Sequence, residues 1–388
     1  MFNLLLCRCI VCDVNENVFV NIIYFIISSC LNIFLYMKKK VLVWLSWWVD
    51  SAVSAALLLQ QWYEVVGWFM KNYVSDKWNC TTFKDAEEAI KVAKFLWIDL
   101  ISFDLQKEYQ ERIIDYIFDW YSKWITPNPD VLCNNLIKFD VFLNKAIGLW
   151  FDYIATWHYA RIIAENWLYH LFQWVDLWKD QSYFLSWLNQ YQLSKSIFPL
   201  WDMTKQQVRE KAKEIWLPNA ERKDSQGLCF IWNVPIRTFL MQKFPKKEWD
   251  ILTLDGKKVW SHQWAYFYTI GQKQWLWLNF KAYVYRIDIE NNILYVTDKD
   301  AEELKTKILI AKKWHWICPG LESEILNWNT CLTGKIRYRQ IPAVSCGLEK
   351  INKCDMRVSF ENEQWAVAPW QVFVAYAWDE CLWNWMIA

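Results

Sequence analysis

The stretch "VLVWLSWWVDSAVSAALLL", Val41–Leu59, decides the fold of this chain. Its first residues are apolar and predict a buried strand, while the residues from Asp50 onward have the apolar spacing of an amphipathic helix. A tight turn around Ser46 separates the two. Strand–turn–helix units bind phosphate in α/β proteins, because free backbone N–H groups at the helix start point at the anion. The stretch therefore predicts an anion site in an α/β domain.

The turn contains three tryptophans, Trp44, Trp47 and Trp48, where a phosphate-binding turn needs glycine so that the backbone can approach the ligand. The whole chain has 31 Trp and 8 Gly in 388 residues. Glycine usually makes up roughly 7 % of a chain, and the two residue types added together reach that ordinary content. Tryptophan thus occupies places that glycine normally takes.

Other tryptophans follow the same rule. Trp62, Trp97 and Trp216 end helix-like stretches, and Trp370 follows Pro369 where a type II turn needs positive φ. A protein naturally rich in tryptophan is the alternative, but tryptophan gains from burial, and these are turns and caps. We therefore predict that the gene encodes glycine by UGA, which this sequence renders as tryptophan.

Length and patterning predict several domains. From Val41 to about Asn233, apolar strands alternate with helical stretches, which favours an α/β fold with a doubly wound parallel sheet. Beyond about Phe244, short strands predominate, with a hairpin around residues 290–292, which favours small β-rich and β-barrel domains. We expect a catalytic domain at 37–235, a central domain at 236–300 and a C-terminal barrel at 301–388.

The first 36 residues differ from the rest. Val18–Tyr36 is mostly apolar and could marginally span a bilayer. No basic region precedes it and no cleavage site follows, unlike in a signal peptide. Because Met37 opens directly into the first strand, we favour a non-native extension at 1–36 over a membrane anchor. We expect a cytoplasmic protein without a membrane partner.

The charge and the cysteine content of the chain count against several classes of protein. The net charge of +1 gives no global electrostatic reason for a nucleic-acid partner. The twelve cysteines lack the regular spacing of a disulfide-stapled secreted domain. Cys7, Cys9 and Cys12 look like half of a metal site without its second half, so we predict no tightly bound metal.

With tryptophan read as glycine, Ser46–Ser51 becomes Ser-Gly-Gly-Val-Asp-Ser and resembles the loop of ATP pyrophosphatases. Further stretches narrow the resemblance to the tRNA-specific 2-thiouridylases, in the family's order and from about Met37 to the end. These stretches are "FMKN" (69–72), "TPNPDVLCN" (126–134), "IATWHYAR" (154–161), "KDQSYFL" (179–185), "KDSQGLCFIW" (223–232), "YTIGQK" (268–273) and "IRYRQ" (336–340). The two cysteine-bearing motifs are the most specific.

The resemblance implies that ATP adenylates the C2 oxygen of the wobble uridine, position 34 of tRNA, and that sulfur then replaces this oxygen. Asp50 and Ser51 suit Mg²⁺ and phosphate contacts, because Mg²⁺ prefers one or two carboxylates with phosphate oxygens. The implied ATP-binding residues are Trp44, Leu45, Ser46, Trp47, Trp48, Val49, Asp50, Ser51, Met70 and Trp157. From local sequence alone, Met70 would be a core residue and Trp157 a turn residue.

The resemblance also assigns the sulfur chemistry, which needs a thiolate nucleophile. Cys229 would carry a persulfide and Cys133 would be the catalytic nucleophile. Asp130 would act as general acid or base, although a turn-capping role after Pro129 is the alternative. A cysteine desulfurase or a sulfur-relay protein would supply the sulfur.

The resemblance implies three groups of tRNA-facing positions, at 128–130, 179–181 and 337–338. The substrates would be the tRNAs for Lys, Glu and Gln. Arg337 and Tyr338 offer a phosphate contact and a stacking face. The group at 179–181 directly precedes "SYFL" (182–185), which we expect to be a strand. The implied contacts are Asn128, Pro129, Asp130, Lys179, Asp180, Gln181, Arg337 and Tyr338.

Two alternatives stay open. If only the loop carries meaning, the chain could be a small-molecule adenylating ligase, although the paired cysteine motifs count against this. If the tryptophans are real, ATP cannot enter the loop, and the chain would be a non-catalytic RNA-binding relic.

Overall fold

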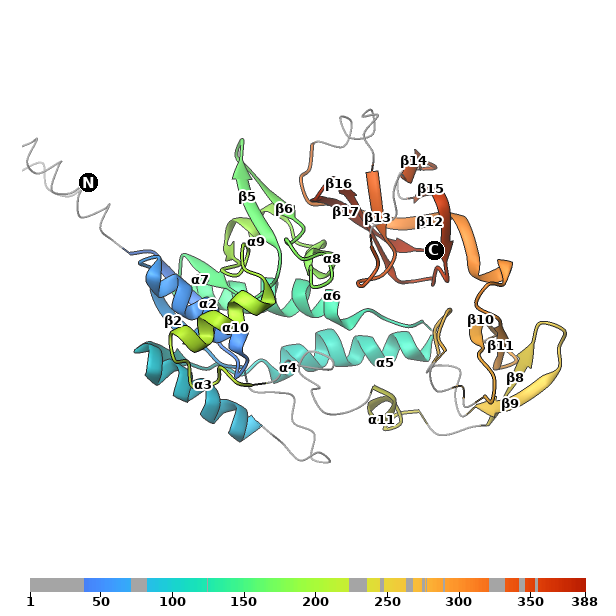
Figure 1. Cartoon of the computed structure of the whole chain (residues 1–388), viewed down its shortest axis with the longest axis horizontal. Coiled ribbons are helices and arrows are strands. Elements are labelled where there is room, and N and C mark those ends of the chain that lie inside the picture. The colour runs from blue at the N-terminus through green and yellow to red at the C-terminus, as the bar shows by residue number, and fades with distance from the viewer. Residues whose placement is uncertain are drawn as a thin grey trace, which may run out of the picture.

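The computed structural model describes most of the chain after the first 37 residues (Figure 1). The described residues are 38–70, 82–123, 125–222, 236–244, 248–262, 268–273, 276, 278–288, 290–320, 332–341, 346–352 and 355–388. The predicted extension at 1–36 and the predicted persulfide carrier Cys229 lie outside them.

The N-terminal domain is built on a five-stranded parallel sheet with the strand order β3-β2-β1-β4-β7. The strands are β1 (Lys40–Trp44), β2 (Glu64–Trp68), β3 (Asp99–Ile101), β4 (Tyr153–Ala155) and β7 (Ser196–Ile197). The chain runs outward from β1 to β3 and then returns to β4 on the other side of β1. The predicted doubly wound sheet is confirmed, and its topological switch point lies between β1 and β4, where open α/β sheets bind ligands.

Helices cover both faces of this sheet (Figure 1). They are α2 (Val49–Gln60), α3 (Thr82–Leu96), α4 (Gln106–Tyr109), η1 (Gln110–Ile114), α5 (Asp115–Ser122), α6 (Pro129–Cys133), η2 (Asn134–Phe142), α7 (Leu143–Gly148), α8 (Ser182–Leu185), α9 (Gln190–Ser194) and α10 (Lys205–Glu214). Side chains of β1 alternate between the faces, as the period of a strand requires. Val41 and Val43 pack in the core that contains α2 and α10. Leu42 and Trp44 pack in the core on the other side, with the helices after β3.

"SYFL" forms the short helix α8, so the expected strand is wrong. Asp180 explains the difference, because its carboxylate accepts a hydrogen bond from the backbone N–H of Ser182 at 3.1 Å and one from the Ser182 hydroxyl at 2.9 Å. A carboxylate that accepts from a first-turn N–H group stabilises the start of a helix.

A hairpin within the N-terminal domain was not predicted. Its strands are β5 (Arg161–Glu165) and β6 (Leu168–Phe172), and β6 also pairs with β17 (Glu380–Ile387) near the C-terminus. The hairpin therefore joins the N-terminal domain to the C-terminal sheet.

Two further sheets follow. The central sheet has the order β10-β11-β8-β9, and the C-terminal sheet contains β13-β16-β17-β12-β15-β14 in antiparallel pairs. The remaining elements are α11 (Ile236–Leu240), β8 (Trp249–Thr253), β9 (Lys258–His262), β10 (Tyr283–Asp288), β11 (Ile293–Thr297), η4 (Glu302–Leu304), β12 (Lys305–Trp316), β13 (Leu332–Lys335), β14 (Cys346–Lys350), β15 (Asp355–Trp365) and β16 (Val372–Ala377). The expected β-rich second half is confirmed, as is the hairpin around residues 290–292, which joins β10 to β11.

Among the described residues, seven tryptophans have a left-handed backbone, a conformation that favours glycine because a Cβ atom strains it. We call them the turn tryptophans: Trp62, Trp97, Trp150, Trp167, Trp216, Trp370 and Trp378, with φ from 52° to 67°. Only four other non-glycine residues in the described part of the chain have positive φ. Every turn tryptophan is at least 40 % exposed, so burial does not compensate for the strain.

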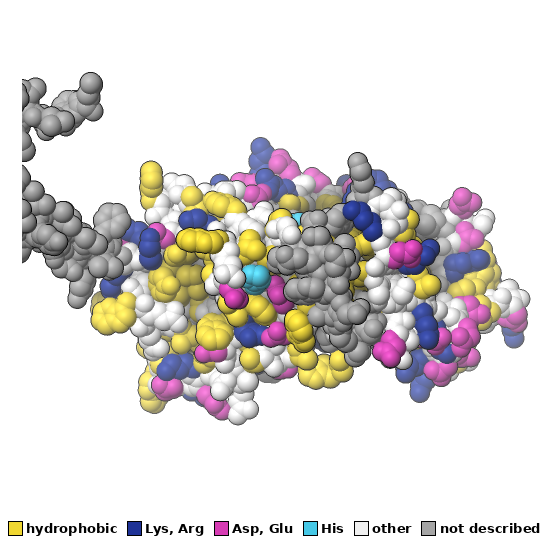
Figure 2. Space-filling model, turned by 90° about the horizontal axis from the view of Figure 1, so that it is seen from above, with side chains coloured by type: hydrophobic (Ala, Val, Ile, Leu, Met, Phe, Trp, Pro, Cys, Tyr) yellow, Lys and Arg dark blue, Asp and Glu magenta, His cyan; other side chains and the backbone are white. Residues whose placement is uncertain are grey.

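Charged side chains of both signs are interspersed over the face shown in Figure 2, in keeping with the small net charge. Hydrophobic side chains reach the surface mainly over the N-terminal half of this view. Among the described residues, no helix has both the length and the apolar character needed to cross a bilayer.

Candidate active site

The turn between β1 and α2 is held by hydrogen bonds between its own ends. The Ser51 hydroxyl lies 2.9 Å from the Ser46 hydroxyl and accepts from the Ser46 backbone N–H at 3.1 Å. Trp48 takes the N-cap position of α2 without a capping side chain. The first N–H groups of this 12-residue helix therefore have no side-chain cap, as an anion-binding helix start requires.

Indole rings fill the carboxyl ends of the central strands. The Trp44 ring at the end of β1 lies 4.4 Å from the Trp68 ring at the end of β2 and 4.9 Å from Phe142 of η2. Trp157, just after β4, lies 6.4 Å from Trp44. Trp44 is only 2 % exposed. The place where a doubly wound sheet binds its ligand is thus occupied by side chains.

Trp47 and Trp48 continue this filling along the turn. Their rings lie 5.6 Å apart, and the Arg222 guanidinium lies 5.8 Å and 5.6 Å from them. The Asn219 amide donates to the Trp47 carbonyl at 3.0 Å. We call Trp44, Trp47, Trp48 and Trp157 the site tryptophans.

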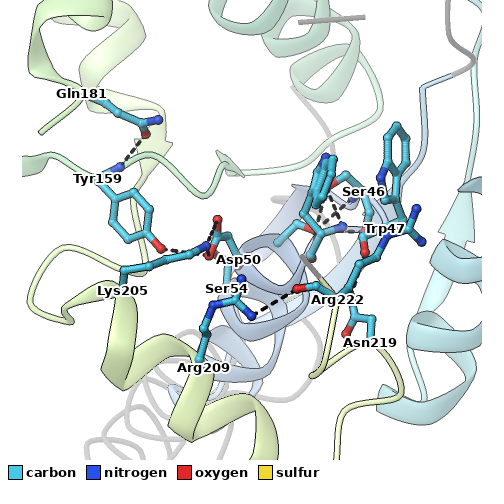
Figure 3. A network of polar contacts seen from close by, with 12 residues as sticks. Ser46, Trp47, Asp50, Ser54, Tyr159, Gln181, Lys205, Arg209, Asn219 and Arg222 are labelled. Atoms are coloured by element: carbon cyan, nitrogen blue, oxygen red, sulfur yellow. Dashed lines mark hydrogen bonds and ion pairs between the residues drawn. The ribbon is translucent and has the colours of Figure 1, made fainter. Parts of the chain in front are cut away.

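The carboxylate of Asp50 in the first turn of α2 has a cationic partner (Figure 3). The Lys205 ammonium donates to both of its oxygens, at 2.6 Å and 2.8 Å, and the Tyr159 hydroxyl donates at 2.8 Å. Lys205 opens α10, where Thr204 and Gln207 form a capping box. The arrangement places a lysine and a tyrosine beside the predicted phosphate loop.

Cys133 ends the short helix α6. Asn128 caps this helix, because its side chain accepts from the Val131 backbone N–H at 3.4 Å, and Pro129 occupies the first turn. Cys133 is 2 % exposed, whereas Asp130 in the first turn is half-buried. The helix continues through η2 to Phe142, so the segment that carries Cys133 reaches the Trp44 ring.

Met70 and Leu45 lie in the core. Met70 is 3 % exposed and belongs to the same apolar cluster as Trp44, while Leu45 faces the cluster on the other side of the sheet. Val49 begins α2 and is buried. Met70 follows β2 and packs against protein, and its expected contact with adenosine stays a prediction.

A buried polar pair lies beside the site tryptophans. The Lys138 ammonium of η2 is 3.4 Å from His158 Nε2, and His158 Nδ1 is 2.8 Å from the Thr156 hydroxyl. Burial, reinforced by the nearby Lys138 charge, holds the pKa of His158 well below its ordinary value of 6.5. His158 is therefore neutral, and because an ammonium group only donates, its Nε2 accepts and its Nδ1–H donates to Thr156.

The expected tRNA contacts at 179–181 divide by exposure. Lys179 is exposed, and Gln181 accepts from the Tyr159 backbone N–H at 2.9 Å. Asp180 is fully buried and pairs with the equally buried Lys335 of β13 at 2.8 Å. The Asp180 carboxylate thus joins the N-terminal domain to the C-terminal sheet, and its expected contact with tRNA does not fit this arrangement.

Arg337 and Tyr338 are both half-buried. The Arg337 guanidinium donates to the carbonyl groups of Trp365 and Ala366. The Tyr338 ring lies 4.3 Å from Phe184, and burial raises the pKa of its hydroxyl to about 12. Both side chains already have protein partners, so contact with tRNA would use the parts of them that stay exposed.

One cluster of the described residues has ligand types suited to a metal. His170, Cys318 and Glu380 lie with their ligand atoms within 4.8 Å of one another. His170 Nδ1 is 2.6 Å from the Glu380 carboxylate, and burial raises the pKa of the Cys318 thiol to about 12. In this structure, hydrogen bonds join the three side chains, with His170 on β6, Glu380 on β17 and Cys318 just after β12.

Sequence reasoning missed Lys205 and Lys138. A capping-box pattern, Thr204 followed three residues later by Gln207, marks the start of α10 and could have drawn attention to Lys205. Nothing local singles out Lys138, which is one lysine in a helical pattern. Tyr159 and His158 lie within the stretch 154–161 that carries the resemblance, but no role was assigned to them.

Comparison with known families agrees with this architecture. Residues 39–233 match the family described as tRNA methyl transferase HUP domain, residues 237–298 its PRC-barrel domain, and residues 306–384 an aminomethyltransferase β-barrel domain. Together these matches cover most of the chain.

Full-length relatives give the same result. The tRNA-specific 2-thiouridylase MnmA of Methylobacillus flagellatus is 40 % identical over 356 residues, which is 89 % of this chain and 98 % of that protein. The protein of the same name from Ralstonia nicotianae is 41 % identical over 360 residues, or 90 % of this chain and 96 % of that protein. A solved U34-tRNA thiolase, NcsA of Methanococcus maripaludis, has a TM-score of 0.33 at 17 % identity over 50 % of this chain and 62 % of that one, too low to support an inference. The matches to the HUP-domain family and to relatives along nearly the whole chain show that it belongs to the tRNA-specific 2-thiouridylase family.

Proposed function

We propose that this chain replaces the C2 oxygen of uridine 34 in tRNA by sulfur, using ATP to activate the oxygen. The single observation that carries the proposal is that the helical segment following Cys133 meets the end of β1, from which the turn 46–51 continues. Phe142 and Lys138 of that segment contact the Trp44 ring at the end of β1. The crevice at the switch point of the sheet is where an α/β enzyme binds nucleotide.

The first step is adenylation. The C2 oxygen of uridine forms a bond to the α-phosphorus of ATP, and the bond to the bridging oxygen breaks. Pyrophosphate leaves with the electron pair, and the N3 proton of the base passes to water. The N–H groups at the start of α2 would stabilise the leaving pyrophosphate, because they carry partial positive charge.

The second step transfers sulfur. A persulfide on Cys229 attacks C2, and AMP leaves with the electron pair of the broken C–O bond. The Cys133 thiolate then attacks the Cys229 sulfur, so that the sulfur bound to C2 departs as thiouridine. A disulfide between the two cysteines remains and has to be reduced by an external thiol. Asp130 would exchange protons near the base, and a sulfur-carrying protein would reload Cys229.

Mg²⁺ would accompany ATP. Asp50 has the carboxylate that Mg²⁺ prefers, but in the present arrangement both of its oxygens accept from Lys205. A magnesium ion would therefore be held mainly by the ATP phosphates, and no step above depends on it.

We also propose that the active enzyme has glycine at the site tryptophans. Trp44 and Trp47 are 2 % and 5 % exposed, so their rings occupy the volume that nucleotide needs. The left-handed backbone at the turn tryptophans supports the same substitution elsewhere in the chain. The non-catalytic RNA-binding relic stays the alternative for the sequence as written, whereas the family relationship disfavours the small-molecule ligase.

Replacing each cysteine tests the sulfur chemistry. In protein with glycine at positions 44, 47, 48 and 157, Cys133→Ser and Cys229→Ser should each abolish thiolation of tRNA, measured as sulfur incorporated from a labelled donor. ATP binding should survive, because neither residue lies in the loop. Cys318→Ser is the matched control, since this buried thiol lies outside the proposed site, and it should keep activity. Normal thiolation by either serine variant would overturn the assignment.

A further inference from the structure

The ammonium group of Lys138 is buried in the candidate site. Lys138 is 5 % exposed, and its nitrogen lies 6.0 Å from the centre of the Trp44 ring and 5.4 Å from that of Trp157. Its hydrogen-bond partner is the neutral His158 at 3.4 Å. Among the residues that the structure describes, no Asp or Glu lies within ion-pair distance of it.

An unpaired buried charge is costly. A buried ammonium loses its hydration, and real proteins keep such a group when an opposite charge or strong acceptors compensate for the loss. A neutral imidazole and two indole faces compensate only in part, since a cation–π contact is a modest attraction. The surroundings of Lys138 therefore leave its charge only partly compensated, and an anionic ligand would compensate the rest.

The position of Lys138 indicates where an anionic ligand would bind. The rings beneath its ammonium belong to Trp44 at the end of β1 and to Trp157 just after β4, the two strands on either side of the switch point. With glycine at both positions the rings are gone, and the ammonium faces the vacated crevice. Anionic ligands of doubly wound sheets bind in this crevice.

The element that carries Lys138 also fits a functional position. Lys138 lies in η2, a π-helical stretch that begins directly after Cys133. Stretches of π-helix are rare and occur frequently at functional sites. Lys138 therefore lies on the segment that carries the proposed nucleophile and faces the end of β1, from which the phosphate loop continues.

We propose that Lys138 binds the α-phosphate of ATP. The inference rests on the proposed function and on glycine at positions 44 and 157. The start of α2 would bind the pyrophosphate end of the nucleotide, and Lys138, on the segment of Cys133, would bind the phosphate that is joined to uridine. His158 positions the ammonium by accepting one of its hydrogens, which leaves the others for phosphate oxygens.

Nucleotide binding tests the proposal in protein with glycine at positions 44, 47, 48 and 157. Lys138→Met should weaken binding of both AMP and ATP roughly 10- to 100-fold, the range for loss of a hydrogen bond to a charged group. Binding of adenosine, which has no phosphate, should stay unchanged. Lys138→Arg keeps the charge and should recover most of the AMP affinity. The measurement is titration calorimetry with each ligand.

Controls separate binding from folding. Lys145→Met removes a partly exposed lysine of α7, whose partner is Glu108 at 3.4 Å, and should leave all three affinities unchanged. Equal losses for adenosine and AMP in Lys138→Met would show a structural role and overturn the proposal. Loss for ATP without loss for AMP would also overturn it. If Lys138→Met does not fold, Lys138→Arg decides, because equal weakening of adenosine and AMP there contradicts the proposal.

The test is independent of thiolation. AMP binding that depends on Lys138 in a protein without thiolation activity would contradict the proposed function and support the phosphate contact. Thiolation at the normal rate by Lys138→Met, with unchanged ATP affinity, would support the function and overturn the contact.

Discussion

The turn tryptophans and the site tryptophans both occupy places suited to glycine, but for different physical reasons. The turn tryptophans have positive φ and stand in solvent, with Trp167 fully exposed and Trp97 95 % exposed. The site tryptophans have no positive φ, and Trp48 has φ of −80°. At the turns the Cβ atom strains the backbone, whereas at the site we propose that the whole ring takes the space of the nucleotide. Tryptophan in place of glycine would therefore reduce stability at the turns and nucleotide binding at the site.

The largest effect is expected at the site. Glycine at positions 44, 47, 48 and 157 should raise the affinity for ATP at least about a thousandfold, because a crevice filled by rings cannot admit the nucleotide. Titration calorimetry and a thiolation assay measure the change.

The matched control uses four turn tryptophans, Trp62, Trp97, Trp216 and Trp370. Replacing these four by glycine should not restore ATP binding. If the sequence as written binds ATP and thiolates tRNA, the distinction between the two groups fails, as does the proposal that glycine belongs at the site. Mass spectrometry of the natural protein would then show tryptophan at positions 47 and 48.

The next effect concerns the turns. Glycine at the turn tryptophans should raise the free energy of unfolding by roughly 0.5–1 kcal/mol at each position, since relief of the left-handed strain exceeds the added flexibility of the unfolded chain. The urea midpoint of unfolding measures it. Trp201→Gly is the control, because Trp201 is 49 % exposed but does not have positive φ, and it should give no gain. A gain at Trp201 equal to that at Trp97 would contradict the role of backbone conformation.

The smallest effect is a pH dependence of stability that the site has and the turns lack. The pKa of His158 is lower in the folded protein than its ordinary 6.5, so below pH 6.5 the unfolded chain binds a proton that the folded protein does not. Stability from this group is present above that pH and is lost as the pH falls. The loss grows as the pH falls from 7.5 to 5.5, because the unfolded chain takes up a proton over this range while burial keeps the folded imidazole neutral.

Urea unfolding at the two pH values measures this difference. His158→Gln should lose less stability between pH 7.5 and 5.5 than the parent protein, because a glutamine side chain does not take up a proton in this range. An identical pH response in the two proteins would show that His158 is protonated in the folded state as readily as in the unfolded one.

Much of the fold could be predicted because its signals are local. The apolar run 41–45, the hairpin around 290–292 and the left-handed backbone at Trp370 all follow from residues close together in the chain. The strand expected at "SYFL" was wrong because four residues are too few to distinguish the side-chain period of a strand from that of a helix. The Asp180 carboxylate stabilises the helix by accepting from the Ser182 backbone N–H.

The contacts of the site could not be predicted in the same way. Lys205 lies 155 residues beyond the Asp50 carboxylate with which it pairs, and Lys335 lies 155 residues beyond Asp180. Such pairs depend on where whole segments pack, and no spacing in the sequence encodes them. Lys179 and Asp180 are neighbours in one motif, but one is exposed and the other is fully buried.

The sequence by itself determined the parallel α/β domain, the strand–turn–helix unit after β1, the β-rich second half and four of the seven turn tryptophans, Trp62, Trp97, Trp216 and Trp370. These features rest on the periodicity of side chains and on the φ angles of single residues, both of which are properties of short segments. Only the tertiary structure decided that Lys138 and His158 lie over the ends of β1 and β4, and that Asp180 is an internal ion-pair partner of Lys335. Burial and charge pairing arise between distant segments, so they exist only once the chain has folded.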